Sequence, residues 1–341
     1  MIAIAIGLFI TLVMATIFAS TSRSFGDLQK SREQIENGRY ALSLLSEEIR
    51  HAGYYGQLGV LAAPVAAVDP CLSPTLTDLY YPVQVYSTAL TAKVTPMLSC
   101  LTATEVSVGS DILVVRRSST IPLAATDVAA TNQLYLQADP TIGAIQLGGG
   151  VVVGTDKAAD GNVATILQKN GVTAAPINKL NVFIYYVSPC SQATCGNSGD
   201  GVPTLKRIEL TTGGGAPVWS TPVPLVSGIE FMQLDLGMDT FPTDTSTVTG
   251  ARGDGAADGA FTETFPGGAT LTQAWNEVVS MRINILARTL ETVPGFVDTG
   301  RTYNLGAAGT LAGSGAYKRH VFSTEVRLNN VAGRRERVLG E

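Results

Sequence analysis

The chain of 341 residues carries 23 Lys and Arg against 28 Asp and Glu, a net charge of −5, and only 15% of its residues are charged. Its length is ample for one large or two ordinary domains, and its low charge argues against a disordered acidic chain. An acidic pI of about 5.2 argues against a nucleic-acid-binding protein. With 36 Gly and many Thr, Ala and Val residues, the composition indicates an exported, β-rich protein.

The first 22 residues contain no charged side chain. A helix of about 20 apolar residues spans about 30 Å, which matches the hydrocarbon core of a bilayer. A cleaved secretory signal is the alternative, but no basic segment precedes the apolar run and no clear cleavage site closes it. We therefore predict that residues 1–22 span a membrane. The apolar residues to which we assign this role are Ile2, Ile4, Ile6, Leu8, Phe9, Leu12, Val13 and Ile17.

The next segment, residues 25–55, is predicted to continue as an amphipathic helix, because apolar residues recur along it at heptad spacing. Ser31 and Gly38 interrupt the apolar stripe, so we expect it to pack on a sheet and not in a strict coiled coil. Gly53 is expected to close the helix. One helix from about residue 2 to residue 52 would be about 75 Å long. The residues expected to pack on the head are Leu28, Ile35, Leu42, Leu45 and Ile49.

After residue 56 the sequence changes to short β-like runs between clusters of Gly, Pro, Asn and Asp. In the run 277–289, apolar and polar residues alternate with the period of two that a strand requires. We predict an α+β fold with a long N-terminal helix at 1–55 packed on a β-rich head at 56–333, followed by a flexible tail at 334–341. The clearest strands are predicted at 111–117, 181–187, 205–211, 277–289 and 319–328.

Four cysteines, Cys71, Cys100, Cys190 and Cys195, allow three disulfide pairings. No nearby His or second Cys-x-x-Cys accompanies them, which argues against a zinc site. Cys190 and Cys195 lie in a short connection between two predicted strands, where a local disulfide fits, and Cys71 and Cys100 then pair by elimination. An even number of cysteines outside the apolar segment indicates an oxidising compartment such as the bacterial periplasm.

Several short segments, spread along the whole chain in order, carry a family resemblance. They are MIAIAIGLF at 1–9, ENGRYAL at 36–42, EIRHAGYYG at 48–56, CSQATC at 190–195, DGVPTL at 200–205, LVSGIE at 225–230, WNEVVSMRI at 275–283 and RHVFST at 319–324. Together these segments resemble the type IV pilus minor pilins of the PilW type. The chain is also similar in plan to the J-type pseudopilins of type II secretion.

The resemblance implies a pilin-like subunit that is anchored in the bacterial inner membrane with its head in the periplasm, and then packed into a pilus at the cell surface. Its apolar helix would lie in the filament core. The implied partners are other minor pilins, the major pilin and inner-membrane lipid. The implied roles are priming of assembly, a place in a tip complex, and support of twitching motility or adhesion.

Two alternatives remain beside the PilW-type pilin: a type II secretion pseudopilin, and a membrane-anchored adhesin or binding head that does not polymerise. A simple anchor needs about 20 apolar residues and a flexible linker. The helical pattern here continues directly into the head, which favours the pilin.

The resemblance also implies a basic leader, a cleavage-site glycine and a glutamate ahead of the apolar helix. In this sequence no acidic residue precedes Asp27. The basic residues Arg23, Lys30 and Arg32 follow the span, and the positive-inside rule would by itself place them in the cytoplasm. We therefore expect the codons directly upstream of Met1 to encode, in frame, the leader and the glutamate.

No catalytic constellation is apparent, and we expect neither enzyme activity nor a cofactor nor a small-molecule substrate. The sequence lacks a Gly-x-Ser-x-Gly elbow, and neither His51 nor His320 has an acidic partner at a catalytic spacing. The glycine runs at 148–150 and 213–215 lack the Lys-Ser/Thr of a P-loop. A glycine-rich loop is a weak candidate for Ca²⁺, although a solvated loop is favoured because the EF-hand spacing is missing. Its acidic residues are Asp239, Asp244, Asp254 and Asp258.

Overall fold

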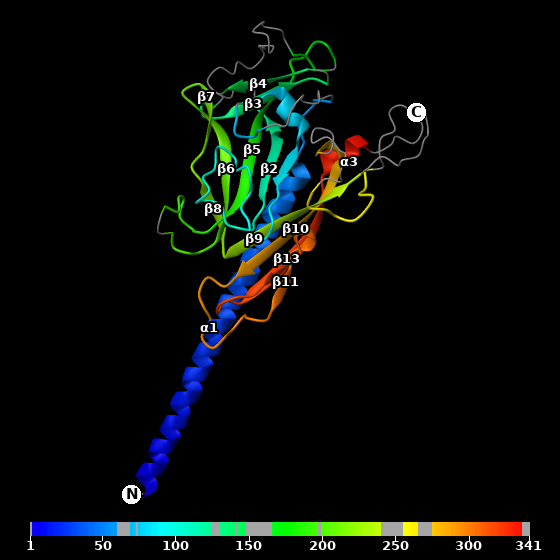
Figure 1. The fold of residues 1–341 in the computed structure, drawn as a ribbon. Helices are drawn as coiled ribbons and strands as arrows, with labels where there is room; N and C mark the ends of the chain where they lie inside the picture. Colours follow the sequence, from blue (N-terminus) through cyan, green and yellow to red (C-terminus); the bar gives the residue numbers. More distant parts are fainter. Residues whose placement is uncertain are drawn as a thin grey trace.

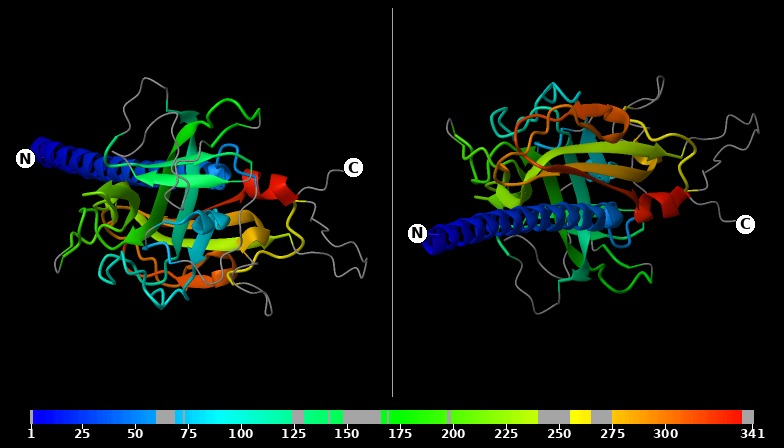
Figure 2. Two further views of the ribbon diagram at one scale, coloured as in Figure 1. Left: turned by 90° about the horizontal axis from the view of Figure 1, so that it is seen from above. Right: turned by 90° about the horizontal axis from the view of Figure 1, so that it is seen from below.

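The chain begins with one long helix, and the N-terminal half of this helix extends beyond the rest of the molecule. The computed structural model describes residues 2–59, 69–72, 74–123, 130–140, 142–147, 166–168, 170–196, 199–239, 255–264 and 275–335. Helix α1 runs from Ile2 to His51, which at 1.5 Å per residue is about 75 Å. Figure 1 shows its N-terminal half projecting from the head, and both views in Figure 2 agree. The helix on a β-rich head that the sequence predicted is confirmed.

The first layer of the head is an antiparallel sheet of eight strands. Its path is β1-β2-β5-β3-β4, and β6 pairs with β5, β7 and β8. Strand β5 is central because β2, β3 and β6 all pair with it. These strands are β1 (Val83–Tyr86), β2 (Ile112–Pro122), β3 (Leu134–Ala138), β4 (Gly143–Leu147), β5 (Ile177–Ser188), β6 (Thr204–Gly213), β7 (Ala216–Trp219) and β8 (Val223–Ser227).

A second, three-stranded antiparallel sheet has the order β13-β10-β9, and β11 and β12 form a separate two-stranded ribbon. The five segments predicted as strands correspond to β2, β5, β6, β10 and β13. The remaining elements are β9 (Ile229–Met238), β10 (Val278–Arg288), β11 (Thr302–Asn304), β12 (Thr310–Ala312), β13 (Arg319–Arg327), the short helices η1 (Leu76–Tyr80), η2 (Trp275–Glu277) and η3 (Gly306–Ala308), and helix α3 (Asn329–Arg335).

Two hydrophobic cores lie on opposite faces of the large sheet. The first fills the space between that sheet, the three-stranded sheet and α1, where Leu45 and Ile49 meet Tyr185 and Met281. The second lies on the other face, where the chain from Leu79 to Leu101 covers strand residues such as Ile184. One face of the C-terminal half of α1 is therefore part of the main core of the head.

A buried carboxylate joins the two sheets. Asp111, which directly precedes β2, is fully buried. One of its oxygens accepts the backbone N–H of Thr88 at 3.0 Å, and the other accepts that of Leu234 on β9 at 2.9 Å. Burial raises the pKa of Asp111 to about 8, against the lowering effect of these two hydrogen bonds, and the neighbouring carboxylates of Glu263 and Asp235 add to the rise.

This raised pKa predicts that the head loses stability as the pH rises from about 4 to about 8. In the unfolded chain the Asp111 carboxyl is ionised above its ordinary pKa of 3.8, whereas in the folded chain it keeps its proton up to about 8. Unfolding therefore releases a proton in this window, and the group contributes a slope of up to about 1.4 kcal/mol per pH unit. Chemical denaturation of the wild type and of Asp111→Asn at several pH values measures this slope. The variant should show the flatter profile, and equal slopes would contradict the assignment.

Candidate functional site

The N-terminal half of α1 presents bare apolar surface on every side. The apolar window of the helix lies outside the head, with none of it buried, and α1 is long and apolar enough to cross a membrane. All eight residues that the sequence assigned to this segment are exposed, from 39% at Val13 to 79% at Ile2. Such a surface is unfavourable in water, because burying it in lipid or against other apolar helices gains about 25 cal/mol per Å². The exposed apolar surface of the N-terminal half of α1 suggests that this half anchors the protein in a membrane.

The C-terminal half of α1 packs on the head through a face that differs in part from the predicted one. Leu45 and Ile49 are fully buried, and Leu42 packs partly buried against the same core. Leu28 and Ile35 are more exposed, at 55% and 39%. The expected heptad stripe is therefore less buried towards its N-terminal end. The residues that face the head there, as the helical spacing continues, are Gln34, Gly38 and Ala41.

At Gly38, helix α1 approaches strand β13 closely. The ring of Phe322 on β13 lies so close that a Cβ added at Gly38 would overlap it, with the ring Cζ at 2.8 Å. Because glycine has no side chain, the helix can approach β13 to this distance. The sequence had marked Gly38 only as a weak point of the apolar stripe, whereas in the structure it is part of the contact.

We expect Gly38→Ala to destabilise the head by up to about 2 kcal/mol. The overlap with Phe322 costs about 1–3 kcal/mol, and the better helix propensity of Ala returns up to about 1 kcal/mol. Gly26→Ala is the matched control, since nothing lies within 4 Å of a Cβ at that position. It should leave stability unchanged or slightly raised. Urea denaturation in detergent compares the two variants, and Phe322→Leu in the Gly38→Ala background should recover part of the loss.

Polar contacts fix the rotation of α1 on the head where apolar contacts are few. The Nε2 of Gln34, a buried side chain, donates to the carbonyl of Ala287 on β10 at 2.7 Å. The Nδ2 of Asn37 donates to the carbonyl of Ser227 on β8 at 3.1 Å. Since both acceptors belong to strand backbone, a turn of the helix about its axis would leave buried polar groups unsatisfied, which costs about 1–3 kcal/mol for each group.

A bidentate ion pair joins α1 to the large sheet. Arg117 on β2 donates from Nε and Nη2 to the two carboxylate oxygens of Glu48, at 2.7 and 3.0 Å. The hydrogen bonds that Arg117 donates to Glu48 raise the pKa of Arg117 above its ordinary value, and burial acts in the opposite direction. Both side chains are largely covered, at 23% and 14% exposed, so this pair is held more firmly than an exposed one.

The C-terminal end of α1 is capped by segments from elsewhere in the chain. The predicted closing residue, Gly53, has φ of +76°, the left-handed conformation that ends many helices. Its N–H donates to the carbonyl of Arg116 on β2 at 2.9 Å. The Nδ2 of Asn330 on α3 donates to the carbonyl of Ala52 at 3.0 Å. The helix end is thus bound both to the large sheet and to the last helix of the chain.

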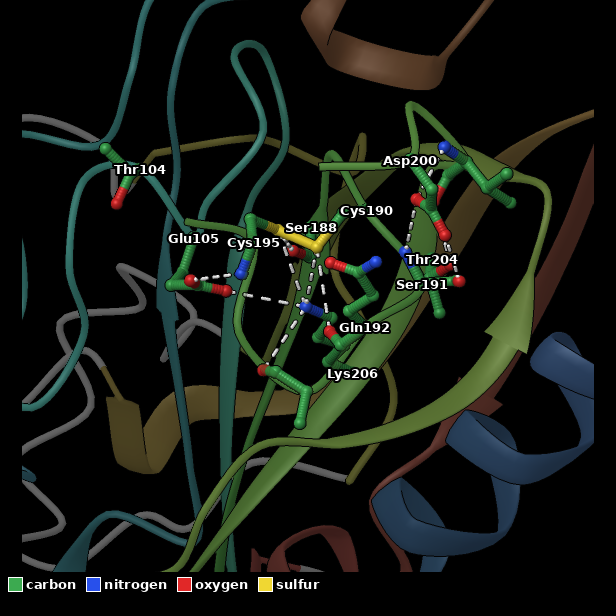
Figure 3. The surroundings of a disulfide bond; sticks show 12 residues. Thr104, Glu105, Ser188, Cys190, Ser191, Gln192, Cys195, Asp200, Thr204 and Lys206 are labelled. Atoms are coloured by element: carbon green, nitrogen blue, oxygen red, sulfur yellow. Dashed lines mark hydrogen bonds and ion pairs between the residues drawn. A yellow bond between two sulfur atoms is a disulfide. The ribbon is translucent and has the colours of Figure 1, made fainter. Parts of the chain in front are cut away.

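Both predicted disulfides are confirmed: Cys71 pairs with Cys100, and Cys190 pairs with Cys195. The first lies beside the covered outer face of the large sheet and packs partly buried against that core. The second lies in the connection between β5 and β6, and Figure 3 shows its surroundings.

The acidic residues of the weak calcium candidate are only partly described. Asp239 is buried, and its Oδ2 accepts the backbone N–H of Gly255 at 2.9 Å. The backbone N–H of Asp258 donates to the carbonyl of Met238. Asp244 and Asp254 lie outside the described residues. A calcium site in this loop remains a prediction.

The chain is similar to known proteins in its sequence and in its structure. The PilW family model, described as type IV pilus-assembly protein W, matches residues 184–330, from β5 into α3. A type IV-like pilin from Thermus thermophilus aligns with a TM-score of 0.37 and 10% identity, over 87% of this chain and 96% of that chain. No curated protein matches the chain. The match to the PilW model confirms the resemblance identified from the sequence.

Proposed function

We propose that this chain is a minor pilin of the PilW type that takes part in type IV pilus biogenesis. The observation that carries the proposal is the division of α1 into a bare apolar half and a half built into the head core, within one continuous helix. The PilW match over residues 184–330 supports the proposal independently, because it covers the head and not this helix.

The direct continuation of the helix into the head favours a filament subunit over a tethered binding head. A tether works best with a flexible linker, which lets the head search for its ligand. Here Gln34, Asn37 and Glu48 hold the helix to three different strands, so the head and the apolar segment have a fixed relative orientation. A fixed orientation is what a subunit needs if its helix packs in a core while its head takes a defined place at the surface.

In the proposed cycle the chain is first held in the bacterial inner membrane by residues 2–22, with its head in the periplasm. It then joins other minor pilins and the major pilin, and contributes to the priming of assembly, with a place in the tip complex. Its contribution to twitching motility and adhesion follows from that place. The proposed role is structural, without catalysis, and Cys71–Cys100 and Cys190–Cys195 suit an oxidising compartment.

A photo-crosslinking amino acid at Phe9, which is 66% exposed on the apolar half, tests the proposal in cells. We expect crosslinks to other pilin subunits and the presence of the chain in sheared pili. Val297, 68% exposed on the head, is the matched position, which should give fewer subunit adducts. Adducts to lipid alone, with the chain absent from pili, would indicate a non-polymerising binding head. Adducts to secretion-machinery subunits would indicate a pseudopilin.

A further inference from the structure

The Cys190–Cys195 disulfide has a buried lysine beside it. Lys206, the third residue of β6, is fully buried, although a lysine is rarely buried without a strong partner. Its Nζ lies 3.4 Å from Oε2 of Glu105, 3.4 Å from Sγ of Cys190 and 3.6 Å from Sγ of Cys195. In Figure 3, dashed lines join the Lys206 ammonium both to the sulfur pair and to the Glu105 carboxylate.

The ammonium is poorly compensated while the disulfide is closed. Glu105 is its one carboxylate partner among the described residues, at a long 3.4 Å, and the carbonyl of Ala193 lies at 3.5 Å. A disulfide sulfur is a weak acceptor that carries no charge. Burial lowers the pKa of Lys206, and the charges of Glu105 and Asp200 offset only part of that effect.

Hydrogen-bond donors converge on Cys195 in particular. The hydroxyl of Ser188, at the end of β5, lies 3.0 Å from Sγ of Cys195 and can only donate to it while the sulfur is in a disulfide. The backbone N–H of Cys195 donates to Oε1 of Glu105 at 2.7 Å, which fixes the loop against that carboxylate. Two donors, a hydroxyl and an ammonium, therefore point at a sulfur that accepts weakly when oxidised and strongly as a thiolate.

The second disulfide of the same chain lacks this arrangement. Among the described contacts, the sulfurs of Cys71 and Cys100 receive the backbone N–H of Cys100 at 3.1 Å and no charged side chain. They pack instead against the apolar core on the outer face of the large sheet. The two disulfides thus offer an internal comparison between a bridge with a buried cation and one without.

A metal site is the competing interpretation of the same residues. One carboxylate oxygen of Glu105 and the sulfurs of Cys190 and Cys195 lie within 4.8 Å of one another. The Lys206 ammonium, however, contacts all three of these atoms and so takes the place in which a metal ion would have to lie. A second cation beside it would be repelled, so we favour a role for the lysine toward sulfur.

We propose that Cys190–Cys195 is a redox-responsive site, in which the buried Lys206 ammonium and the Ser188 hydroxyl are placed to stabilise the Cys195 thiolate that forms when a dithiol reductant opens the bridge. The reductant passes two electrons to the disulfide and becomes a disulfide itself. One of its two protons stays on Cys190 and the other is released to solvent. This proposal goes beyond the pilin function and does not depend on it.

Graded reduction of the full chain in detergent tests the proposal. The protein is equilibrated with mixtures of reduced and oxidised dithiothreitol, trapped with iodoacetamide and mapped by mass spectrometry. We expect Lys206→Met to need at least a tenfold higher ratio of reduced to oxidised reagent to open Cys190–Cys195, and Lys206→Arg to restore most of the wild-type behaviour. Cys71–Cys100 should respond equally in all variants.

A pH profile of alkylation separates a thiolate effect from a loss of packing. In the reduced wild type, Cys195 should react with a midpoint below the ordinary thiol pKa of about 8.5, and in Lys206→Met at or above it. Lys179→Met is the matched control. Lys179 on β5 forms an ion pair with Glu209 on β6 at 2.9 Å, and no contact between Lys179 and the sulfurs is found among the described residues. If Lys206→Met does not fold, Glu105→Gln is used in its place. This variant removes the anion that competes with the Cys195 thiolate for the Lys206 ammonium, so the pH midpoint of Cys195 alkylation should fall further below that of the wild type.

The proposal would be overturned if the wild type and Lys206→Met opened Cys190–Cys195 at the same ratio of reduced to oxidised dithiothreitol and showed the same pH profile of Cys195 alkylation. It would also be overturned if the reduced wild type bound Zn²⁺ stoichiometrically through Glu105 and the two cysteines, because the cluster would then be a metal site.

Discussion

Replacing Leu12 by Asp is expected to remove the protein from the membrane and from filaments while its head stays folded. Leu12 lies near the middle of the exposed apolar segment and is 59% exposed, and no charged residue lies in residues 1–22 to pair with the new carboxylate. A charge at this depth costs about 2.5–3.5 kcal/mol on insertion scales, and an uncompensated charge is equally unfavourable between packed apolar helices. Membrane fractionation and immunodetection in sheared pili measure the two losses.

Ser43→Asp is the matched control for this prediction. Ser43 lies on the same helix, exposed and beyond the apolar segment, so an acid there tests the effect of added charge alone. Both variants should keep the thermal unfolding transition of the head. If Leu12→Asp reached membranes and pili at the wild-type level, the assignment of residues 2–22 to insertion and assembly would be wrong.

Replacing both Cys71 and Cys100 by Ser should cost the head about 3–4 kcal/mol of unfolding free energy. The bridge closes a separation of 29 residues, and the chain-entropy model gives this magnitude for a loop of that length. The closed loop contains Leu79, Val94 and Leu98, which cover the outer face of the large sheet, so its loosening also exposes apolar surface. We expect a midpoint lower by about 5–10 °C in thermal denaturation.

The double replacement at Cys190 and Cys195 is the comparison. That bridge spans a separation of only 5 residues, and the same model gives about 2 kcal/mol. A loss at Cys190–Cys195 that equals or exceeds the loss at Cys71–Cys100 would contradict the loop-length argument.

The sequence predicted the helix well because its two halves differ in composition, but its contact face only in part. Leu45 and Ile49 are buried as a heptad stripe implies. Gln34 and Gly38 were missed. Gln34 contacts the sheet through a hydrogen bond, and Gly38 allows the close approach of Phe322 because it has no side chain. Neither contributes to an apolar pattern. The signal that could have found them is the spacing of 34, 38, 41 and 45, which continues one helical face regardless of polarity.

Strand β9 was not among the predicted strands, although its sequence alternates between apolar and polar residues. In this strand Met232, Leu234 and Leu236 alternate with Gln233 and Asp235, and the two polar side chains are fully buried. Their partners come from distant segments: Gln233 donates to Gly109, and Asp235 accepts from Asn284. The Lys206–Glu105 pair could not be predicted either, because it joins residues 101 positions apart. Lys206 lies on the buried face of β6 with Ile208 and Leu210.

The course of α1 along β13 determines how the protein responds to a mechanical pull. Gly38 lies against Phe322, and Ala52 is bonded to Asn330, so the helix and the strand run side by side in the same direction. A tensile force applied at the N-terminal end acts along this shared axis. It therefore loads the Gln34, Asn37 and Glu48 contacts together in shear, and does not peel them apart one after another. Resistance to such a force is governed by the unfolding rate and not by equilibrium stability. The head can thus stay attached to its helix under tension even if its global stability is modest.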